Sequence, residues 1–340
     1  MREEIVHLHP RGAFHLGERG IGLEETADVI HADTLHAALC VAWATLFDQD
    51  EMAAALLKAD DPPLLLSSAF PFAGPVRFYP RPLLPLAAAA PLDPAFLRQL
   101  KEVRFVSEGV LCRLLGERAY PQAVEAIHGG TALLLADEAE ALRAHAGVRT
   151  LEGLRFWEVS RVPRVALDVR SGRSNIWHFG RVAFRQGAGF FFRVRYRDEA
   201  LADRFRAAVR LLGDTGLGGD RSSGHGLFRA TFEPAEPLGE ANADHFVTLA
   251  PVYPPRDQVQ ALLGPDARYH WLTRGGWIGG ATPTPYRRRG VRLLAEGAFL
   301  AGRPAALWGA LADVTPEETP EPLPHRVYRY GFAFPVGVSP

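Results

Sequence analysis

The spacing of apolar residues predicts two amphipathic helices in the first two thirds of the chain. The first follows Asp33, which we expect to be its N-cap, and its apolar face recurs every three or four positions: Leu35, Ala38, Leu39, Ala42, Trp43 and Leu46. The second follows Asp198, a further expected cap, and carries the same kind of stripe: Leu201, Phe205, Ala208, Val209 and Leu212.

Alternation with a period of two predicts strands around these helices. We expect them at residues 3–9, 64–70, 165–169, 182–184, 190–197 and 227–233. The pattern is clearest in the fifth, where Phe190, Phe192, Val194 and Tyr196 alternate with Phe191, Arg193, Arg195 and Arg197. This alternation predicts a half-buried strand with its apolar face inward and its row of arginines outward.

The order of these elements predicts an α+β fold. Strand, helix, strands, helix, strand is the βαββαβ plan of a ferredoxin-like (RRM-like) domain, and it disfavours a doubly wound sheet. Strand patterns start again after residue 237, at 243–250, 268–273, 291–299 and 327–334, with a short helix at 257–263. We therefore expect two ferredoxin-like domains, 1–237 and 238–340, of which the second is degenerate. The first carries an insertion at 60–160 that looks irregular and partly helical, because nine prolines between 60 and 94 forbid a long helix there.

Composition narrows the class of protein. With 340 residues, 47% of them hydrophobic and 23% charged, the chain can bury a core and is neither disordered nor fibrous. It has no uncharged apolar window of membrane-spanning length, and its N-terminus reads as a strand rather than an export signal. The two cysteines, Cys40 and Cys112, are too few for a disulfide framework or a cysteine zinc cage. We expect a cytoplasmic protein with no membrane partner, metal or other cofactor.

The formal net charge of −1 conceals a segregation of charge. All but two of the 38 basic residues are arginine, and residues 169–197 and 267–295 hold seven and six arginines without an acid. The acids gather elsewhere, at 48–61 and 316–321. Arginine suits phosphate and base recognition because its planar fork donates paired hydrogen bonds and stacks. The two basic stretches predict a surface for a polyanion; two solvated faces in an arginine-rich composition are the alternative.

The glycine-rich loop at residues 213–226 is the most informative stretch. A dinucleotide motif needs glycine where Arg221 stands, and a phosphate-loop motif needs lysine where His225 stands. The loop also follows a helix and precedes a strand, the reverse of both motifs. Its glycines still let the backbone approach an anion and turn successive amides towards it, while Arg221, Ser222 and Ser223 add side-chain donors. A long flexible turn is the alternative interpretation.

The form of this loop, Gly-x-Gly-Gly-x-Arg-Ser-Ser-Gly-x-Gly, resembles the glycine-rich loop of the RAMP superfamily of CRISPR proteins. Further stretches at 14–17, 30–39, 173–175, 187–192, 275–277 and 328–334 occur in an order that is similar to one family within it. That family is the fourth Csm subunit, the 5′-handle-binding subunit of type III-A effector complexes. Ala32 and His36 stand where the family usually has serine and phenylalanine.

The resemblance implies a non-catalytic RNA-binding subunit of a ribonucleoprotein complex in antiviral defence. Such a subunit grips the crRNA 5′ handle and bridges the large polymerase-cyclase subunit to the backbone RAMP subunits. The residues implied to contact RNA lie in the N-terminal loop, the first helix start, a protruding hairpin and the glycine-rich loop: His15, Asp33, Thr34, Arg173, Ser174, Asn175, His178, Arg181, Gly216, Gly218, Gly219, Arg221, Ser222 and Ser223. Trp177 is either a platform for a stacked base or a hydrophobic anchor of the hairpin.

Three other functions stay open. One is the equivalent capping subunit of a type III-B complex, which shares the loop and the position. Another is a metal-independent crRNA-processing endoribonuclease, which the five N-terminal histidines would serve: His7, His9, His15, His31 and His36. The third is a pure scaffold, in which the arginine tract 287–289 docks an acidic protein surface.

Overall fold

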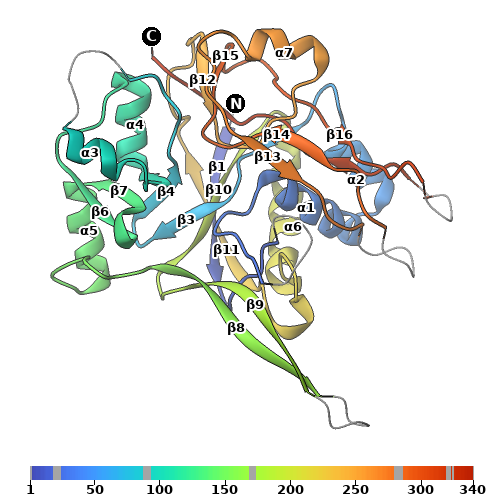
Figure 1. The fold of residues 1–340 in the computed structure, drawn as a ribbon. Helices are drawn as coiled ribbons and strands as arrows, with labels where there is room; N and C mark the ends of the chain where they lie inside the picture. The colour runs from blue at the N-terminus through green and yellow to red at the C-terminus, as the bar shows by residue number, and fades with distance from the viewer. Residues whose placement is uncertain are drawn as a thin grey trace.

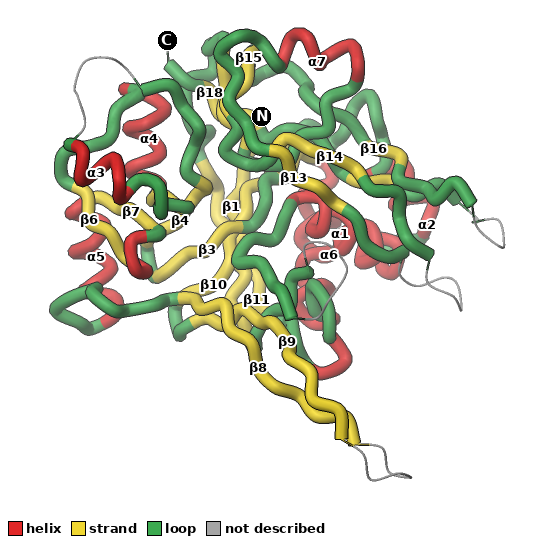
Figure 2. Tube along the Cα trace, in the orientation of Figure 1, coloured by secondary structure: helices red, strands yellow, loops and turns green. Residues whose placement is uncertain are grey.

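The computed structural model describes residues 2–17, 24–86, 93–167, 174–278, 286–318, 323 and 325–339. A nine-stranded mixed sheet runs through the N-terminal two thirds of the chain, in the order β11-β1-β10-β3-β4-β5-β7-β6, with β2 also paired to β10 (Figures 1 and 2). Its strands are β1 (Arg2–Pro10), β2 (Leu64–Leu66), β3 (Phe70–Ala73), β4 (Val76–Pro80), β5 (Phe105–Ser107), β6 (Val124–Ile127), β7 (Ala132–Leu135), β10 (Ala188–Tyr196) and β11 (Phe228–Ala235).

Two of the helices on this sheet are the predicted ones, α1 (Ala32–Leu46) and α6 (Ala202–Thr215), and they pack against each other. Most residues of the two stripes are buried as expected, but Ala38 and Leu201 are half-buried and Leu46, at the end of α1, is 43% exposed. Asp198 accepts a hydrogen bond from the amide of Ala200 and so caps the short turn that leads into α6, as predicted. The additional helix α2 (Gln49–Leu56) follows α1 in the acidic stretch.

The prediction that Asp33 caps α1 is wrong. The N-cap position belongs to His31, and Asp33 lies inside the first turn. The hydroxyl of Ser68 accepts the hydrogen bond from the amide of Ala32 at 2.9 Å, so a distant segment supplies a partner for the helix start. The Asp33 carboxylate is thereby free to face other groups.

The central strand β10 corrects a second prediction. It lies between β1 on one edge and β2 and β3 on the other, and all its residues are buried. Its even face packs on α6, where Phe192 and Tyr196 contact the ring of Phe205. Arg193 and Arg195, expected on an exposed face, are 1% and 8% exposed because other segments of the chain cover that face as well.

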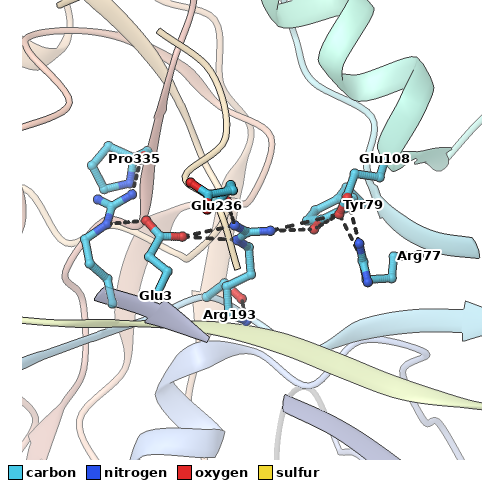
Figure 3. Close-up of polar contacts among 9 residues, drawn as sticks. Glu3, Arg77, Tyr79, Glu108, Arg193, Glu236 and Pro335 are labelled. Carbon is cyan, nitrogen blue, oxygen red and sulfur yellow. Dashed lines mark hydrogen bonds and ion pairs between the residues drawn. The ribbon is translucent and has the colours of Figure 1, made fainter. Parts of the chain in front are cut away.

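Charge pairing makes the burial of these two arginines possible. Both bind the carboxylate of Glu3 on the neighbouring strand, Arg195 at 2.7 Å and Arg193 at 3.1 Å (Figure 3). Arg193 also donates to the carbonyl of Glu236 in the linker, and Arg195 to the carbonyl of Pro335 at 3.2 Å. The network therefore fastens the end of the chain to the centre of the large sheet.

The insertion is regular, in contrast to our expectation. Strands β5 and β7 pair in parallel, β6 pairs with β7, and the unit extends the main sheet through β4. Its helices are α3 (Pro94–Gln99), α4 (Glu108–Glu117) and α5 (Ala136–Ala146). Strands of three or four residues are too short for alternation to identify them, and the expected strand 64–70 is itself two strands.

The C-terminal third contains several small sheets. Strands β12 (His245–Thr248), β15 (Phe299–Ala301) and β18 (Pro335–Gly337) form one of them. Two pairs accompany it, β13 (Trp271–Arg274) with β14 (Val291–Leu294) and β16 (Ala312–Asp313) with β17 (Tyr328–Arg329), together with helix α7 (Arg256–Leu262). The expected strand 291–299 is divided between β14 and β15. Within the expected strand 327–334, Tyr330, Phe332 and Phe334 are buried, whereas Tyr328 is 37% exposed.

A long hairpin projects from the molecule (Figure 1). It consists of β8 (Trp157–Leu167) and β9 (Ser174–Phe184), paired in antiparallel register along their whole length. No helix in the described ranges combines the length and the apolar character that a bilayer crossing needs.

Candidate nucleic-acid interface

A groove of about 460 Å³ lies where four distant segments of the chain meet. One wall is the N-terminal loop at residues 15–17 and a second is the side of α1 that includes Thr34. The loop after α6 forms the third, and Arg274, Trp277 and Arg288 complete it. Six of the residues implied to contact RNA therefore line one cavity: His15, Thr34, Gly216, Gly218, Gly219 and Arg221.

The glycine-rich loop needs glycine for close packing on the N-terminal loop. Gly218 has φ +99°, and a Cβ there would stand 2.4 Å from the carbonyl oxygen of His15. A Cβ on Gly219 would stand 2.7 Å from the Cδ2 atom of His15. A side chain at position 218 would therefore require the backbone to move, and one at position 219 would require the buried ring of His15 to move.

Hydrogen bonds fix the loop rather than leave it flexible. The amide of Gly219 donates to the carbonyl of His15 at 2.9 Å, and that of Gly226 donates to the carbonyl of Ala13 at 2.9 Å. The amides of residues 216, 217, 223 and 224 also donate to backbone carbonyls. The expectation that successive amides turn towards an anion is therefore wrong for these six positions. The loop offers an anion its exposed side chains instead, above all Arg221, with Ser222 and Ser223 beside it.

The middle of the hairpin contacts the glycine-rich loop and the N-terminal loop. Arg164 on β8 donates to Asp220 of the glycine-rich loop at 2.6 Å. Its guanidinium also lies 4.1 Å from the centre of the Phe179 ring on β9. Phe179 in turn contacts the rings of His15 and His225, at centroid distances of 4.5 and 5.1 Å. Trp177 contacts the same Phe179 and is half-buried, so it serves at least as an anchor here.

The remaining hairpin residues do not gather in one place. Ser174 and His178 are exposed and share one face of β9, because side chains alternate along a strand. Arg181 lies on the opposite face, with its Nε 3.5 Å from the hydroxyl of Ser160. The side chain of Asn175 and the whole of Arg173 lie outside what the structure describes.

His15 is buried and its position is fixed. Its Nδ1 is 2.7 Å from the carbonyl oxygen of Gly180, so Nδ1 carries the proton and donates it. The residue lines the groove and is 5% exposed.

Asp33 is surrounded by arginines from the C-terminal third. Its carboxylate accepts hydrogen bonds from the Nε of Arg274 at 3.0 Å and from Arg329. Burial alone would raise the pKa of Asp33, but these two guanidiniums hold it well below its usual range. The hydroxyl of Thr34 accepts from Arg274 at 2.8 Å. Arg288 lines the groove next to them. We did not predict Arg274, Arg288 and Arg329 from the sequence, although the first two lie in the second basic stretch.

The N-terminal histidines occupy separate environments. His31 pairs with Glu296 at 2.6 Å, and His36 lies 3.0 Å from the carbonyl oxygen of Leu56. His7 and His9 lie on the sheet beside Phe72. Burial lowers the pKa values of His7 and His36 to about 4, so both are neutral at pH 7. The described residues therefore do not assemble the five rings into one acid–base site.

Comparisons with known proteins agree along the whole chain. Residues 241–338 match the family "CRISPR Csm4 C-terminal domain". The chain is 28% identical over 334 residues to "CRISPR system Cms protein Csm4" of Thermococcus onnurineus (strain NA1), a match that covers 98% of this chain and 96% of that protein. It is 26% identical over 308 residues to the protein of the same name from Mycobacterium tuberculosis (strain CDC 1551 / Oshkosh), with 88% of each covered.

Solved structures share the fold. A chain of the Csm3–Csm4 subcomplex of a type III-A CRISPR-Cas interference complex superposes with a TM-score of 0.67 and 16% identity, covering all of both chains. A chain of a Csm1–Csm4 cassette in complex with cA4 gives 0.58 and 20%, covering all of this chain and 98% of that one. The two relatives match over 88% or more of each chain, and the Csm4 C-terminal domain matches the C-terminal third. The chain is therefore similar to Csm4 proteins over most of its length, and its residues 241–338 belong to the Csm4 C-terminal domain family.

Proposed function

We propose that this chain is the non-catalytic RNA-binding subunit of a type III-A CRISPR interference complex in the cytoplasm. It grips the crRNA 5′ handle and bridges the large polymerase-cyclase subunit to the backbone RAMP subunits. Solved structures with the same fold come from assemblies with Csm3 and with Csm1, which supports a place between two such partners.

One observation carries the RNA-binding part of the proposal. The N-terminal loop, the start of α1, the glycine-rich loop and the second basic stretch are far apart in the sequence and line one groove. Guanidinium groups in such a groove suit phosphates, and single-stranded RNA is held by phosphate contacts together with stacking of its bases. The projecting hairpin bonds to the glycine-rich loop that lines this groove, and provides a second contact region for a strand that leaves it.

The strand order supports a ferredoxin-like domain in residues 1–237. If the first helix is α1 and the second α6, the strands around them are β1, β2 with β3, β10 and β11. Their order in the sheet, β11-β1-β10 followed by β2 and β3, is the one that a βαββαβ unit adopts. We propose residues 238–340 as the second domain.

The alternatives have less support. The histidines that a nuclease would use have separate structural partners, which favours binding over cleavage. The arginine tract is divided: Arg288 lines the groove, whereas Arg289 donates to the carbonyl of Asp313 at 2.7 Å. If the tract only bound the surface of a partner protein, there would be no reason for Arg288 to line the groove. The curated relatives carry the Csm4 name, which favours type III-A over type III-B.

Substitution of Arg221 by alanine tests the proposal. The measurement is binding of the full chain to a fluorescein-labelled single-stranded RNA copied from the repeat, by anisotropy at several salt concentrations. We expect about tenfold weaker binding and a salt slope smaller by about 0.7, the value for one lost phosphate contact on a single strand. Arg113→Ala is the matched control, because Arg113 is exposed on α4 and, within the described residues, its one ion pair is with the neighbouring Glu117.

Equal affinities of the two variants would show that the glycine-rich loop does not hold RNA. Cleavage of the RNA by the wild-type chain would instead favour the nuclease.

A further inference from the structure

We propose that Arg274 and Arg288 form a subsite for one phosphate group of single-stranded RNA, and that Trp277 stacks on the adjoining base. The proposal rests on the proposed function and deepens it, because it makes the C-terminal third a direct part of the RNA grip. All three residues line the groove beside Thr34.

The first argument is the arrangement of charge. Asp33 and Arg329 lie behind the groove wall, buried to 2% and 4% exposure. Asp33 binds both Arg274 and Arg329, and Arg329 also donates to the carbonyl of Gly275 at 2.7 Å. This buried centre fixes the backbone and the guanidinium of the groove-lining Arg274. A pre-positioned guanidinium loses little freedom when it binds a phosphate.

The second argument is an excess of positive charge. Among the described residues, the guanidiniums of Arg274, Arg288 and Arg329 lie around the carboxylate of Asp33. The nearby carboxylate of Glu296 is paired with His31 and so does not balance them. Burial, and after it the nearby Arg329, lowers the pKa of Arg288. An anion in the groove would relieve this repulsion, and a phosphate matches the geometry of a guanidinium.

The third argument is an unsatisfied donor. The Nε of Arg288 is buried and has no hydrogen-bond partner within the described part of the chain. A buried donor without an acceptor is costly and uncommon in folded proteins. Because Arg288 lines the groove, an oxygen of a bound RNA strand can accept the hydrogen bond that this Nε donates.

Trp277 stands beside these charges on a fixed piece of backbone. The amide of Arg288 donates to the carbonyl of Gly276 at 2.9 Å, and Trp277 forms a β-bridge with Arg287. The Arg287 guanidinium lies 5.9 Å from the centre of the Trp277 ring, which is 50% exposed. An exposed indole next to a phosphate-binding arginine is the combination that holds one nucleotide of a single strand.

A purely structural role for Arg288 predicts something different. If Arg288 only stabilised the packing of the C-terminal third on the rest of the chain, its replacement would lower the melting temperature and leave RNA binding unchanged. If it serves a phosphate, removal relieves repulsion in the free protein and weakens binding. Stability and affinity therefore move in opposite directions under our proposal.

The experiment compares Arg288→Ala with Arg289→Ala in the full chain, using the same labelled repeat RNA. Arg289 is the matched control, since it lies in the same tract and bonds to the carbonyl of Asp313. For R288A we expect an unchanged or higher melting temperature, about tenfold weaker binding and a salt slope smaller by about 0.7. For Trp277→Ala we expect about tenfold weaker binding with an unchanged salt slope, because stacking releases no counterions. Trp277→Phe should recover part of that loss.

The outcomes separate the two proposals. If R288A binds like R289A while R221A is weakened, this subsite is wrong and the proposed function stands. A lower melting temperature of R288A with unchanged affinity also overturns the subsite. If the wild-type chain does not bind the RNA at all, both proposals fail.

Discussion

Arg164 and Asp220 join the projecting hairpin to the glycine-rich loop through a 2.6 Å hydrogen bond between residues 56 positions apart. Asp220 also accepts from the hydroxyl of Ser223 at 2.9 Å, while Arg164 lies over the ring of Phe179. The direction of the hairpin and the shape of the loop are therefore set together. The hairpin and the groove-lining loop therefore keep one fixed arrangement relative to each other.

The pair should show a measurable coupling. A double-mutant cycle of Arg164→Ala and Asp220→Ala, measured by urea unfolding, should give about 1 kcal/mol, modest because both side chains are partly exposed. Amide exchange in β8 and β9 should become faster in either single variant. A coupling of zero would mean that the aromatic contacts alone hold the hairpin.

Alanine at Gly218 should be far more damaging than alanine at Gly224. Both residues have positive φ, +99° and +81°, so both substitutions cost about 1 kcal/mol in backbone strain. Only at Gly218 does the new Cβ also collide with the carbonyl of His15, whereas nothing lies within 4 Å at Gly224. We expect Gly218→Ala to lose about 2 kcal/mol or more of unfolding free energy. Equal losses in the two variants would contradict the packing described for the loop.

Glu3→Gln should strongly destabilise the protein. Arg193 and Arg195 are buried and both bind Glu3, so the change leaves two positive charges without their buried counter-charge (Figure 3). Breaking a buried pair in this way costs about 3 kcal/mol or more. Glu117→Gln removes an exposed partner of Arg113 and should cost less than about 0.5 kcal/mol. Urea unfolding of both variants is the measurement, and similar losses would contradict this role for Glu3.

His36 should make the protein less stable in mild acid. Burial lowers its pKa from 6.5 to about 4, so the unfolded chain takes up a proton that the folded chain refuses. The free energy of unfolding that the neutral His36 contributes is complete above about pH 6.5 and is lost as the pH falls towards 4. Between pH 7 and pH 5 the loss is about 2 kcal/mol. His36→Phe should remove this part of the pH dependence in chemical denaturation, and an unchanged slope would contradict it.

The features that sequence predicted well are local. Helices α1 and α6 follow from apolar spacing over about three turns each. The strand observed at 188–196 follows from the alternation in residues 190–197. The glycine-rich loop was recognisable from its high density of glycine. At Gly218 and Gly219 the structure shows why glycine stands there, because a Cβ would collide with His15. The ordered set of short motifs was enough to identify the family.

The features that could not be predicted from the sequence depend on which distant segments pack against one another. The alternation in β10 correctly separated Arg193 and Arg195 from the apolar face, but only the fold shows that the other face is buried and that Glu3 balances it. Asp33 has the sequence position of an N-cap, and only the approach of Ser68 shows why that role passes elsewhere.

Sequence alone thus determined helices α1 and α6, strand β10, the resemblance to the Csm4 family and the glycine-rich loop, since each depends on residues that are close along the chain. The tertiary structure decided where the charges act. It placed Asp33 against Arg274 and Arg329, more than 240 positions away, and brought Arg288 to the groove. The energy of a charge depends on its burial and on the charges around it, and both are set by contacts between distant segments.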